Sequence, residues 1–138
     1  MADGKTLEFE IMTPQKRVFK GEVESLIAEA TDGSFGVLLD HAPLLSAIKF
    51  GIVRLKEAGG GAEKVFVTSD GFFEVNDNRA SLLVDTAETK EEIDIARAKA
   101  AKDRAEQRLN NPAESIDIER ARAALMRALM RLQATGSK

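Results

Sequence analysis

The chain has 138 residues, a formal net charge of -3 and no cysteine. Its length accommodates one domain and an appendage, and its 43% hydrophobic and 31% charged residues are typical of a globular protein and not of a disordered one. The small net charge excludes a broad attraction to nucleic acid or anionic lipid, and the lack of cysteine excludes disulfides, thiolate metal sites and cysteine nucleophiles.

In the first part of the chain, short apolar segments are separated by turn-forming residues. Leu7, Phe9 and Ile11 alternate with glutamates, which is the period of a half-buried strand. All seven phenylalanines lie in this part, so we expect the main core here. The pattern predicts an antiparallel sandwich or barrel. Its further strands are expected at 23–30, 36–39, 52–55, 65–68, 72–75 and 80–84.

The composition changes at Asp85-Thr86-Ala87, after which helix-forming alanine, lysine, arginine, glutamate and leucine dominate. Thr89 and Glu92 form a capping-box pattern, which predicts that a first helix starts there and continues to about Leu109.

A second helix is expected after a short link. Pro112 suits the first position of this helix, which should continue to about Gln133. Two helices joined by so short a link are expected to form an antiparallel hairpin. The predicted fold class is therefore α+β, with a sandwich domain over residues 1–86 and a two-helix domain over residues 87–138.

The two expected helices share a repeat. Ile93-Asp94-Ile95-Ala96-Arg97-Ala98 recurs as Ile116-Asp117-Ile118-Glu119-Arg120-Ala121. Three arginines follow the same i, i+7, i+11 spacing in each helix, which confines each set to about 40° of arc. Guanidinium groups bind oxyanions in a bidentate manner, so the pattern fits a polyanionic ligand; it equally fits a solvated helix face. The six residues are Arg97, Arg104, Arg108, Arg120, Arg127 and Arg131.

The sequence offers no catalytic motif. His41 is the single histidine and stands in a turn-like segment without a serine or cysteine nucleophile, so we expect a packing or capping role. Phosphate-binding glycine loops, dinucleotide fingerprints and metal-ligand spacings are missing, which argues against an enzyme, a metal site and a free-standing nucleotide hydrolase. We also expect no secretory signal and no membrane span, so a membrane would be reached only through a partner.

Three stretches resemble the epsilon subunit of bacterial F-type ATP synthases. These are Gly33-Ser34-Phe35-Gly36-Val37-Leu38 with the following His41-Ala42-Pro43-Leu44-Leu45, then Gly71-Phe72-Phe73-Glu74-Val75, and finally Asp85-Thr86-Ala87-Glu88. Two departures fall in turns, where Leu39-Asp40 replaces the usual Pro-Gly and Ser69-Asp70-Gly71 the usual Ser-Gly-Gly.

The resemblance implies a non-catalytic rotor subunit with a sandwich of about ten strands. The sandwich would sit against the gamma subunit and the ring of c subunits, peripherally at the cytoplasmic face of a bacterial cell membrane. The hairpin would be mobile, and in its extended state it would reach the catalytic beta subunits and inhibit ATP hydrolysis.

Some members of this family bind ATP in the folded hairpin through an Ile/Leu-Asp-x-x-Arg-Ala motif, which Ile93-Asp94-Ile95-Ala96-Arg97-Ala98 matches. The resemblance then implies ATP, with or without magnesium, as a regulatory ligand that stabilises the folded state, and no catalytic cofactor. It assigns Glu88 and Asp94 to the adenine, Ile93 and Ala98 to packing near the base, Arg97, Arg104, Arg127 and Arg131 to the phosphates, and Arg120 to a supporting role.

A second function class remains open at this stage. The chain could be an interaction module whose hairpin arginines dock on acidic helices of a partner without binding nucleotide. The two functions differ at Glu88 and Asp94, because base recognition requires these acids whereas docking on an acidic partner would be favoured by their loss.

Overall fold

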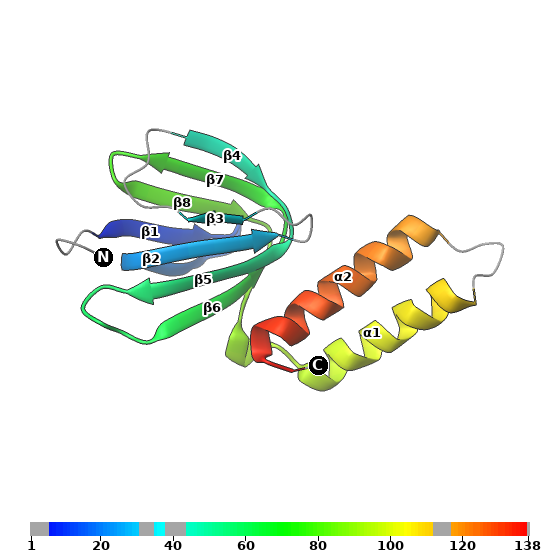
Figure 1. The fold of residues 1–138 in the computed structure, drawn as a ribbon. Helices are drawn as coiled ribbons and strands as arrows, with labels where there is room; N and C mark the ends of the chain where they lie inside the picture. The colour runs from blue at the N-terminus through cyan, green and yellow to red at the C-terminus, as the bar shows by residue number, and fades with distance from the viewer. Residues whose placement is uncertain (1–5, 31–34, 38–43, 112–116, 138) are drawn as a thin grey trace. The chain divides into compact units, whose positions relative to one another are not determined.

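The computed structural model describes residues 6–30, 35–37, 44–111 and 117–137. The chain divides into two compact units, Met1–Thr89 and Lys90–Lys138. Strands make up the first unit and helices the second (Figure 1). The strands of the first unit are β1 (Leu7–Met12), β2 (Arg17–Ala30), β3 (Phe35–Val37), β4 (Leu44–Ile48), β5 (Gly51–Glu57), β6 (Glu63–Thr68), β7 (Gly71–Asn76), β8 (Arg79–Val84) and β9 (Ala87–Thr89).

These strands form one hydrogen-bonded sheet in the order β4-β7-β8-β1-β2-β5-β6-β9, with β3 paired to β2. The long strand β2 joins the two halves of the sheet, because its first residues pair with β1 and its later ones with β5. A register shift between Val23 and Ser25 separates the two pairings. The predicted fold class is confirmed, with the difference that β1 and β8 run parallel in an otherwise antiparallel arrangement.

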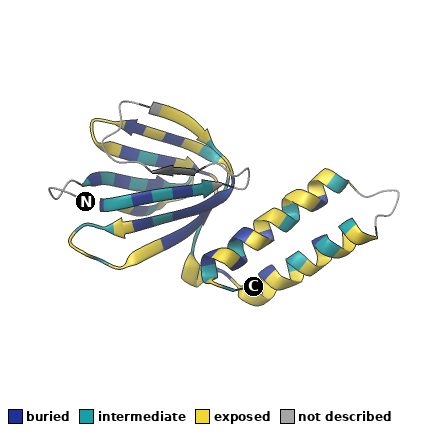
Figure 2. Cartoon of the chain, in the orientation of Figure 1, coloured by how far each residue is buried: buried dark blue, intermediate teal, exposed yellow. Residues whose placement is uncertain are grey.

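The core of the first unit forms between the inward faces of the two halves of the sheet. Burial alternates along β1, β7 and β8, as Figure 2 shows, because successive side chains point to opposite faces of a strand. Three aromatic contacts connect the halves: the ring centroid of Phe9 lies 6.1 Å from that of Phe19 and 6.2 Å from that of Phe73, and Phe19 lies 5.9 Å from Phe66. The expectation that the main core lies in this part of the chain is thereby met.

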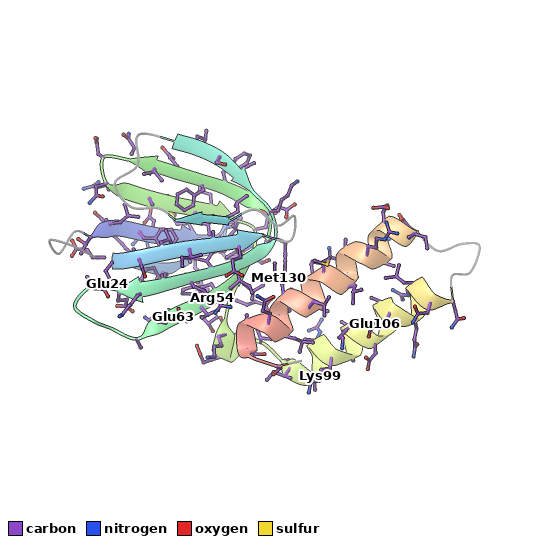
Figure 3. The ribbon with its side chains drawn as sticks, viewed as in Figure 1. Glu24, Arg54, Glu63, Lys99, Glu106 and Met130 are labelled. Carbon is purple, nitrogen blue, oxygen red and sulfur yellow. The ribbon has the colours of Figure 1, made fainter. Side chains whose placement is uncertain are left out.

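The outward face of β2, β5 and β6 carries ion pairs (Figure 3). Arg54 lies between Glu29 and Glu63, with nitrogen–oxygen distances of 3.8 and 3.9 Å, and Lys56 lies 3.4 Å from Glu24. Such solvent-accessible pairs contribute about 0 to 1 kcal/mol each, so this surface is a solvated face.

The first α-helix begins later than the capping-box pattern at Thr89 predicts, six residues after Thr89 at Ile95. Thr89 pairs with Phe66 as the last residue of β9, a short strand that the sequence did not indicate. Residues Lys90–Glu92 then form a short 3₁₀ helix (η2), and α1 (Ile95–Asn110) begins behind Asp94, whose side chain accepts a 3.0 Å hydrogen bond from the Arg97 backbone N–H. The last strand of the sheet, β9, is therefore formed by residues that follow the change in composition.

The second helix, α2 (Ile118–Thr135), begins in the same way. The Asp117 side chain accepts a 3.1 Å hydrogen bond from the Arg120 N–H, and Gly136 ends the helix with a left-handed φ of 77°. Pro112, which was expected to start this helix, lies outside the described residues. The two helices pack side by side in opposite directions, so the predicted hairpin is confirmed (Figure 1).

Candidate functional site

In both helices of the hairpin an arginine directly precedes a buried alanine. Ala98 and Ala105 are the buried residues of α1, and they follow Arg97 and Arg104. The same pairs occur in α2 as Arg120-Ala121 and Arg127-Ala128, and Arg131 precedes the buried Leu132. Successive residues of an α-helix are about 100° apart around the helix axis. In each helix, the arginines therefore lie about 100° from the line of buried residues, which we call the packed stripe, and on the same side of it with respect to the direction of the chain.

This shared offset places both sets on one face of the hairpin. Seen from one end, two antiparallel helices turn in opposite senses, and their packed stripes also point in opposite directions. The two reversals cancel, so an equal offset in each helix leads to the same side. We call this surface the arginine face, and it comprises Arg97, Arg104, Arg108, Arg120, Arg127 and Arg131.

The arginine face is cationic, and most of its arginines have no ion-pair partner among the described residues. Arg131 is half-buried and interacts with other groups, whereas the other five arginines are exposed. Within the described part of the chain, none of these five forms an ion pair. The acid Glu119 bonds Arg122, which lies on another side of α2, at 3.2 Å. Five unpaired guanidinium groups on one face can bind an oxyanion at little cost in existing interactions.

The residues predicted to recognise the adenine do not all lie in one unit. Ile93 and Ala98 are buried beside the start of α1, and Asp94 is exposed there as the cap of the helix. Glu88 lies instead in β9 of the first unit, opposite Val67 of β6. The hairpin itself therefore brings together Asp94, two apolar residues and the arginine face.

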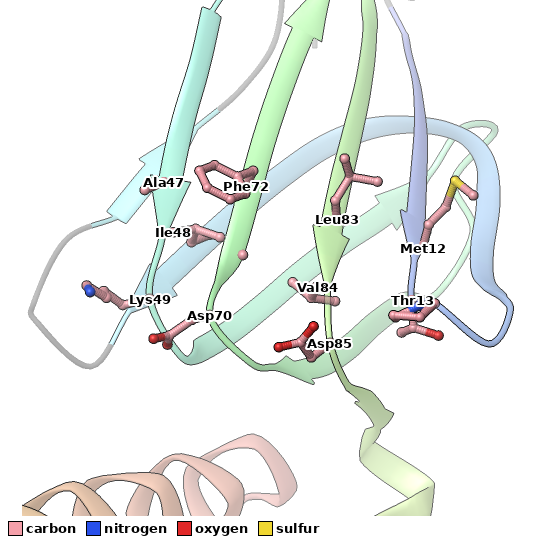
Figure 4. Close-up of a pocket in the computed structure, with 12 residues that line it drawn as sticks. Met12, Thr13, Ala47, Ile48, Lys49, Asp70, Phe72, Leu83, Val84 and Asp85 are labelled. Carbon is pink, nitrogen blue, oxygen red and sulfur yellow. The ribbon is translucent and has the colours of Figure 1, made fainter.

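The first unit has a different kind of candidate surface, made of apolar side chains. Ala47, Phe72, Leu83 and Met12 are cross-strand neighbours on β4, β7, β8 and β1. They point away from the core, and we call them the apolar row (Figure 4). Phe72 is 55% and Leu83 44% exposed, and the row borders a hollow of about 580 Å³. An exposed apolar surface of this kind is typical of a site that binds another protein.

The apolar row was not predicted from the sequence, although the sequence carries a signal for it. Phe72-Phe73 and Leu82-Leu83 are adjacent pairs within predicted strands, and neighbours on a strand must face opposite sides. One large apolar residue of each pair had to point outward. In the structure Phe73 and Leu82 are buried, and their sequence neighbours Phe72 and Leu83 point outward as part of the apolar row.

Other kinds of site are not found in the described residues. The ranges 6–30, 35–37, 44–111 and 117–137 contain no group of three acidic or histidine side chains arranged to hold a metal ion. Across those same ranges, no helix is sufficiently long and apolar to cross a bilayer. His41 falls outside the described residues, so its expected packing or capping role stays a prediction.

Comparison with known proteins identifies the family of both units. Residues 6–90 match the beta-sandwich domain of the ATP synthase delta/epsilon chain, and residues 91–136 match its long alpha-helix domain. A protein named ATP synthase epsilon chain from Desulforamulus reducens is 50% identical over 107 residues, which cover 78% of this chain and 80% of that protein. The epsilon chain from Ruminiclostridium cellulolyticum is 42% identical over 133 residues, covering 96% of this chain and 98% of the relative.

Solved structures share the fold. A chain of the Euglena gracilis mitochondrial ATP synthase, from a structure of OSCP, F1 and c-ring, matches with a TM-score of 0.67 at 20% identity over 99% of this chain and 82% of that chain. A chain of the Tetrahymena thermophila central stalk and c-ring matches with a TM-score of 0.58 at 18% identity, covering 94% and 96%. The curated relatives are non-catalytic subunits, which agrees with the prediction from the sequence. The chain belongs to the ATP synthase delta/epsilon chain family, as its sequence resemblance indicated.

Proposed function

We propose that the chain regulates ATP hydrolysis by an ATP synthase complex through its helical hairpin, which binds ATP in a folded state and inhibits the catalytic subunits in an extended one. The observation that carries the proposal is the arginine face, where arginines of two helices lie on one side of the hairpin, and five of them (Arg97, Arg104, Arg108, Arg120 and Arg127) are exposed and have no ion-pair partner among the described residues. ATP that binds only the folded hairpin stabilises that state by mass action and relieves the inhibition.

The proposed ATP site uses the end of the hairpin at which α1 begins. Asp94 keeps acceptor capacity beyond its bond to the Arg97 N–H, because a carboxylate has about four acceptor positions. It accepts a hydrogen bond from the adenine amino group, while the base packs near Ile93 and Ala98. The phosphates are bound by Arg97, Arg104, Arg127 and Arg131. Arg120, in the first turn of α2, has a supporting role. Glu88 is retained as a further proposed contact to the adenine.

Replacing Asp94 with serine tests this site against docking on an acidic partner. Serine preserves the helix cap but removes the carboxylate, so ATP binding measured by calorimetry on the full chain should weaken by about tenfold or more. Asp117→Ser is the matched control, because Asp117 caps α2 in the same geometry, and it should bind ATP like the wild type.

The outcomes separate the two functions. If millimolar ATP releases no heat with the wild-type chain, nucleotide binding is wrong. If Asp94→Ser binds ATP as tightly as the wild type, the base is not recognised at Asp94, and the arginines serve a partner surface instead.

We further propose that the first unit attaches the chain to the rotor, at the gamma subunit and the c-ring, and so holds it peripherally at the cytoplasmic face of a bacterial membrane. The apolar row supports this attachment, since it exposes large apolar side chains beside a hollow. Both solved relatives come from structures that contain a c-ring. The extended hairpin would contact the catalytic beta subunits.

Phe72→Ser should weaken the binding of the chain to a gamma–c-ring subcomplex by about tenfold or more, because a truncated aromatic in an apolar contact typically costs over 1 kcal/mol. Pull-down with increasing amounts of the chain measures this effect. Ser46→Ala, a change at an exposed residue of β4, is the control. Unchanged binding of Phe72→Ser would exclude the apolar row from the attachment.

A further inference from the structure

We propose that the partner surface bound by the apolar row carries basic side chains on both sides of an apolar one, and that these pair with two exposed acids of the first unit, Asp85 and Glu74. The inference rests on the proposed attachment of the first unit through this row, and it adds the chemistry of the partner. It follows from where polar side chains lie on the outward face of β1, β4, β7 and β8.

The two acids lie on opposite sides of the row. Glu74 is the next outward residue after Phe72 on β7 and is the cross-strand neighbour of Ser81 on β8. Asp85 directly follows β8, two residues beyond Leu83, at the other side of the row (Figure 4). Ser81 and Asp85 are four residues apart, and four residues of extended chain span about 13 Å. One cation therefore cannot contact both carboxylates.

Neither acid is neutralised by the rest of the described chain. Both Asp85 and Glu74 are exposed, and among the described residues their carboxylates form no ion pair and accept no hydrogen bond. Glu10, another acid on the same face, lies by contrast 3.4 Å from Arg17. The two unpaired carboxylates can therefore bind outside cations without the loss of an existing ion pair.

The hollow beside the row combines apolar walls with a charged rim. It has a volume of about 580 Å³, and its lining includes Met12, Phe72, Leu83, Lys49, Asp70 and Asp85 (Figure 4). One oxygen of Asp70 accepts a 2.7 Å hydrogen bond from the Phe50 N–H. Two carboxylates against one ammonium leave this rim acidic. A lysine or arginine of the partner fits such a hollow, because its apolar stem packs on Phe72 and Leu83 while its cationic head pairs with Asp85.

The same acids disfavour two other occupants of the row. A second copy of the chain would bring its own Asp85 and Glu74 to the contact, because a two-fold interface uses the same surface of both copies. Like charges would then approach one another, which is costly at an interface. An anionic lipid surface would be repelled for the same reason. A protein surface with separated basic side chains is the one that complements this face.

Binding of the full chain to the gamma–c-ring subcomplex at several salt concentrations tests the inference. Glu74→Gln combined with Asp85→Asn removes both charges at nearly constant shape, and at low salt it should weaken binding by about tenfold or more. The difference from the wild type should shrink as salt rises, because salt screens the ion pairs of the wild type. Glu74→Asp combined with Asp85→Glu keeps both charges and should bind within about threefold of the wild type.

The control, Glu91→Gln combined with Asp103→Asn, removes the same charge from exposed positions of the second unit and should bind like the wild type. An equal loss in this control would indicate net charge alone and overturn the inference.

The remaining outcomes separate this inference from the attachment itself. If Phe72→Ser weakens binding and the neutral double variant of Glu74 and Asp85 does not, the inference alone is wrong. If Phe72→Ser leaves binding unchanged, the attachment through the row fails, and the inference fails with it. A dimer of the isolated chain that Phe72→Ser dissociates would place a second copy on the row and would also overturn the inference.

Discussion

Replacing Arg104 and Arg127 together with alanine should weaken ATP binding by the full chain more than a hundredfold. Both residues are exposed on the arginine face, midway along the two helices, and neither has an ion-pair partner among the described residues. A hydrogen bond to a charged group contributes about 1.5–3 kcal/mol, so the loss of each guanidinium should cost about tenfold or more in affinity. Calorimetric titration with ATP measures the change.

The structure offers a matched control for this prediction. Arg122 is an exposed arginine of α2 that points away from the arginine face and is bonded to Glu119 at 3.2 Å. Arg122→Ala should leave the affinity for ATP within about twofold of the wild type. If Arg122→Ala costs as much as Arg127→Ala, the binding depends on overall charge and the arginine face is not a defined site.

The second large effect concerns the stability of the sandwich. A side chain at Gly71 has no room, because its Cβ would overlap the carbonyl oxygen of Leu83 and lie 2.8 Å from Val84 Cγ1. Gly71 pairs with Val84 in the β7–β8 ladder, so Gly71→Ala must separate two hydrogen-bonded strands. We expect a loss of about 3 kcal/mol in the free energy of unfolding, which should lower the urea midpoint by about 1 M or more.

Gly21→Ala is the control for this stability prediction. Gly21 also lies within a strand, but the nearest atoms to a Cβ there belong to the Phe19 ring, at 3.3 Å, and a ring can shift more easily than a backbone carbonyl. Its urea midpoint should stay close to that of the wild type. Equal midpoints for Gly71→Ala and the wild type would show that β7 and β8 separate without cost.

Local patterns in the sequence were sufficient for most of the first unit. The alternation in Leu7–Met12 and the adjacent apolar pairs in β7 and β8 predict strands directly. The strand Ala87–Thr89 carries no such pattern, and it exists because its backbone pairs with β6. The parallel pairing of β1 with β8 likewise joins segments about seventy residues apart, which no local pattern indicates.

The start of the first helix shows why one matching motif was not enough. Thr89 and Glu92 have the residue types of a capping box, but the turn that follows Thr89 is the short 3₁₀ helix Lys90–Glu92, and Asp94 caps α1 instead. The internal repeat was the better signal, since Asp94 and Asp117 occupy equivalent positions in it and both act as caps. The arginine spacing was likewise informative, although the common face of the two sets follows only from the antiparallel packing.

The proposed regulation is tested most directly by the rate of ATP hydrolysis of the assembled complex with a truncated subunit. Truncation after Thr89 retains every strand of the sheet and removes η2, α1 and α2. We predict that the truncated subunit leaves hydrolysis uninhibited at low ATP, whereas the full chain inhibits it. A full chain with Arg104→Ala and Arg127→Ala should inhibit even at high ATP, because the folded hairpin is no longer stabilised. Equal hydrolysis rates with the truncated and full-length subunits at low ATP would contradict the proposed regulation.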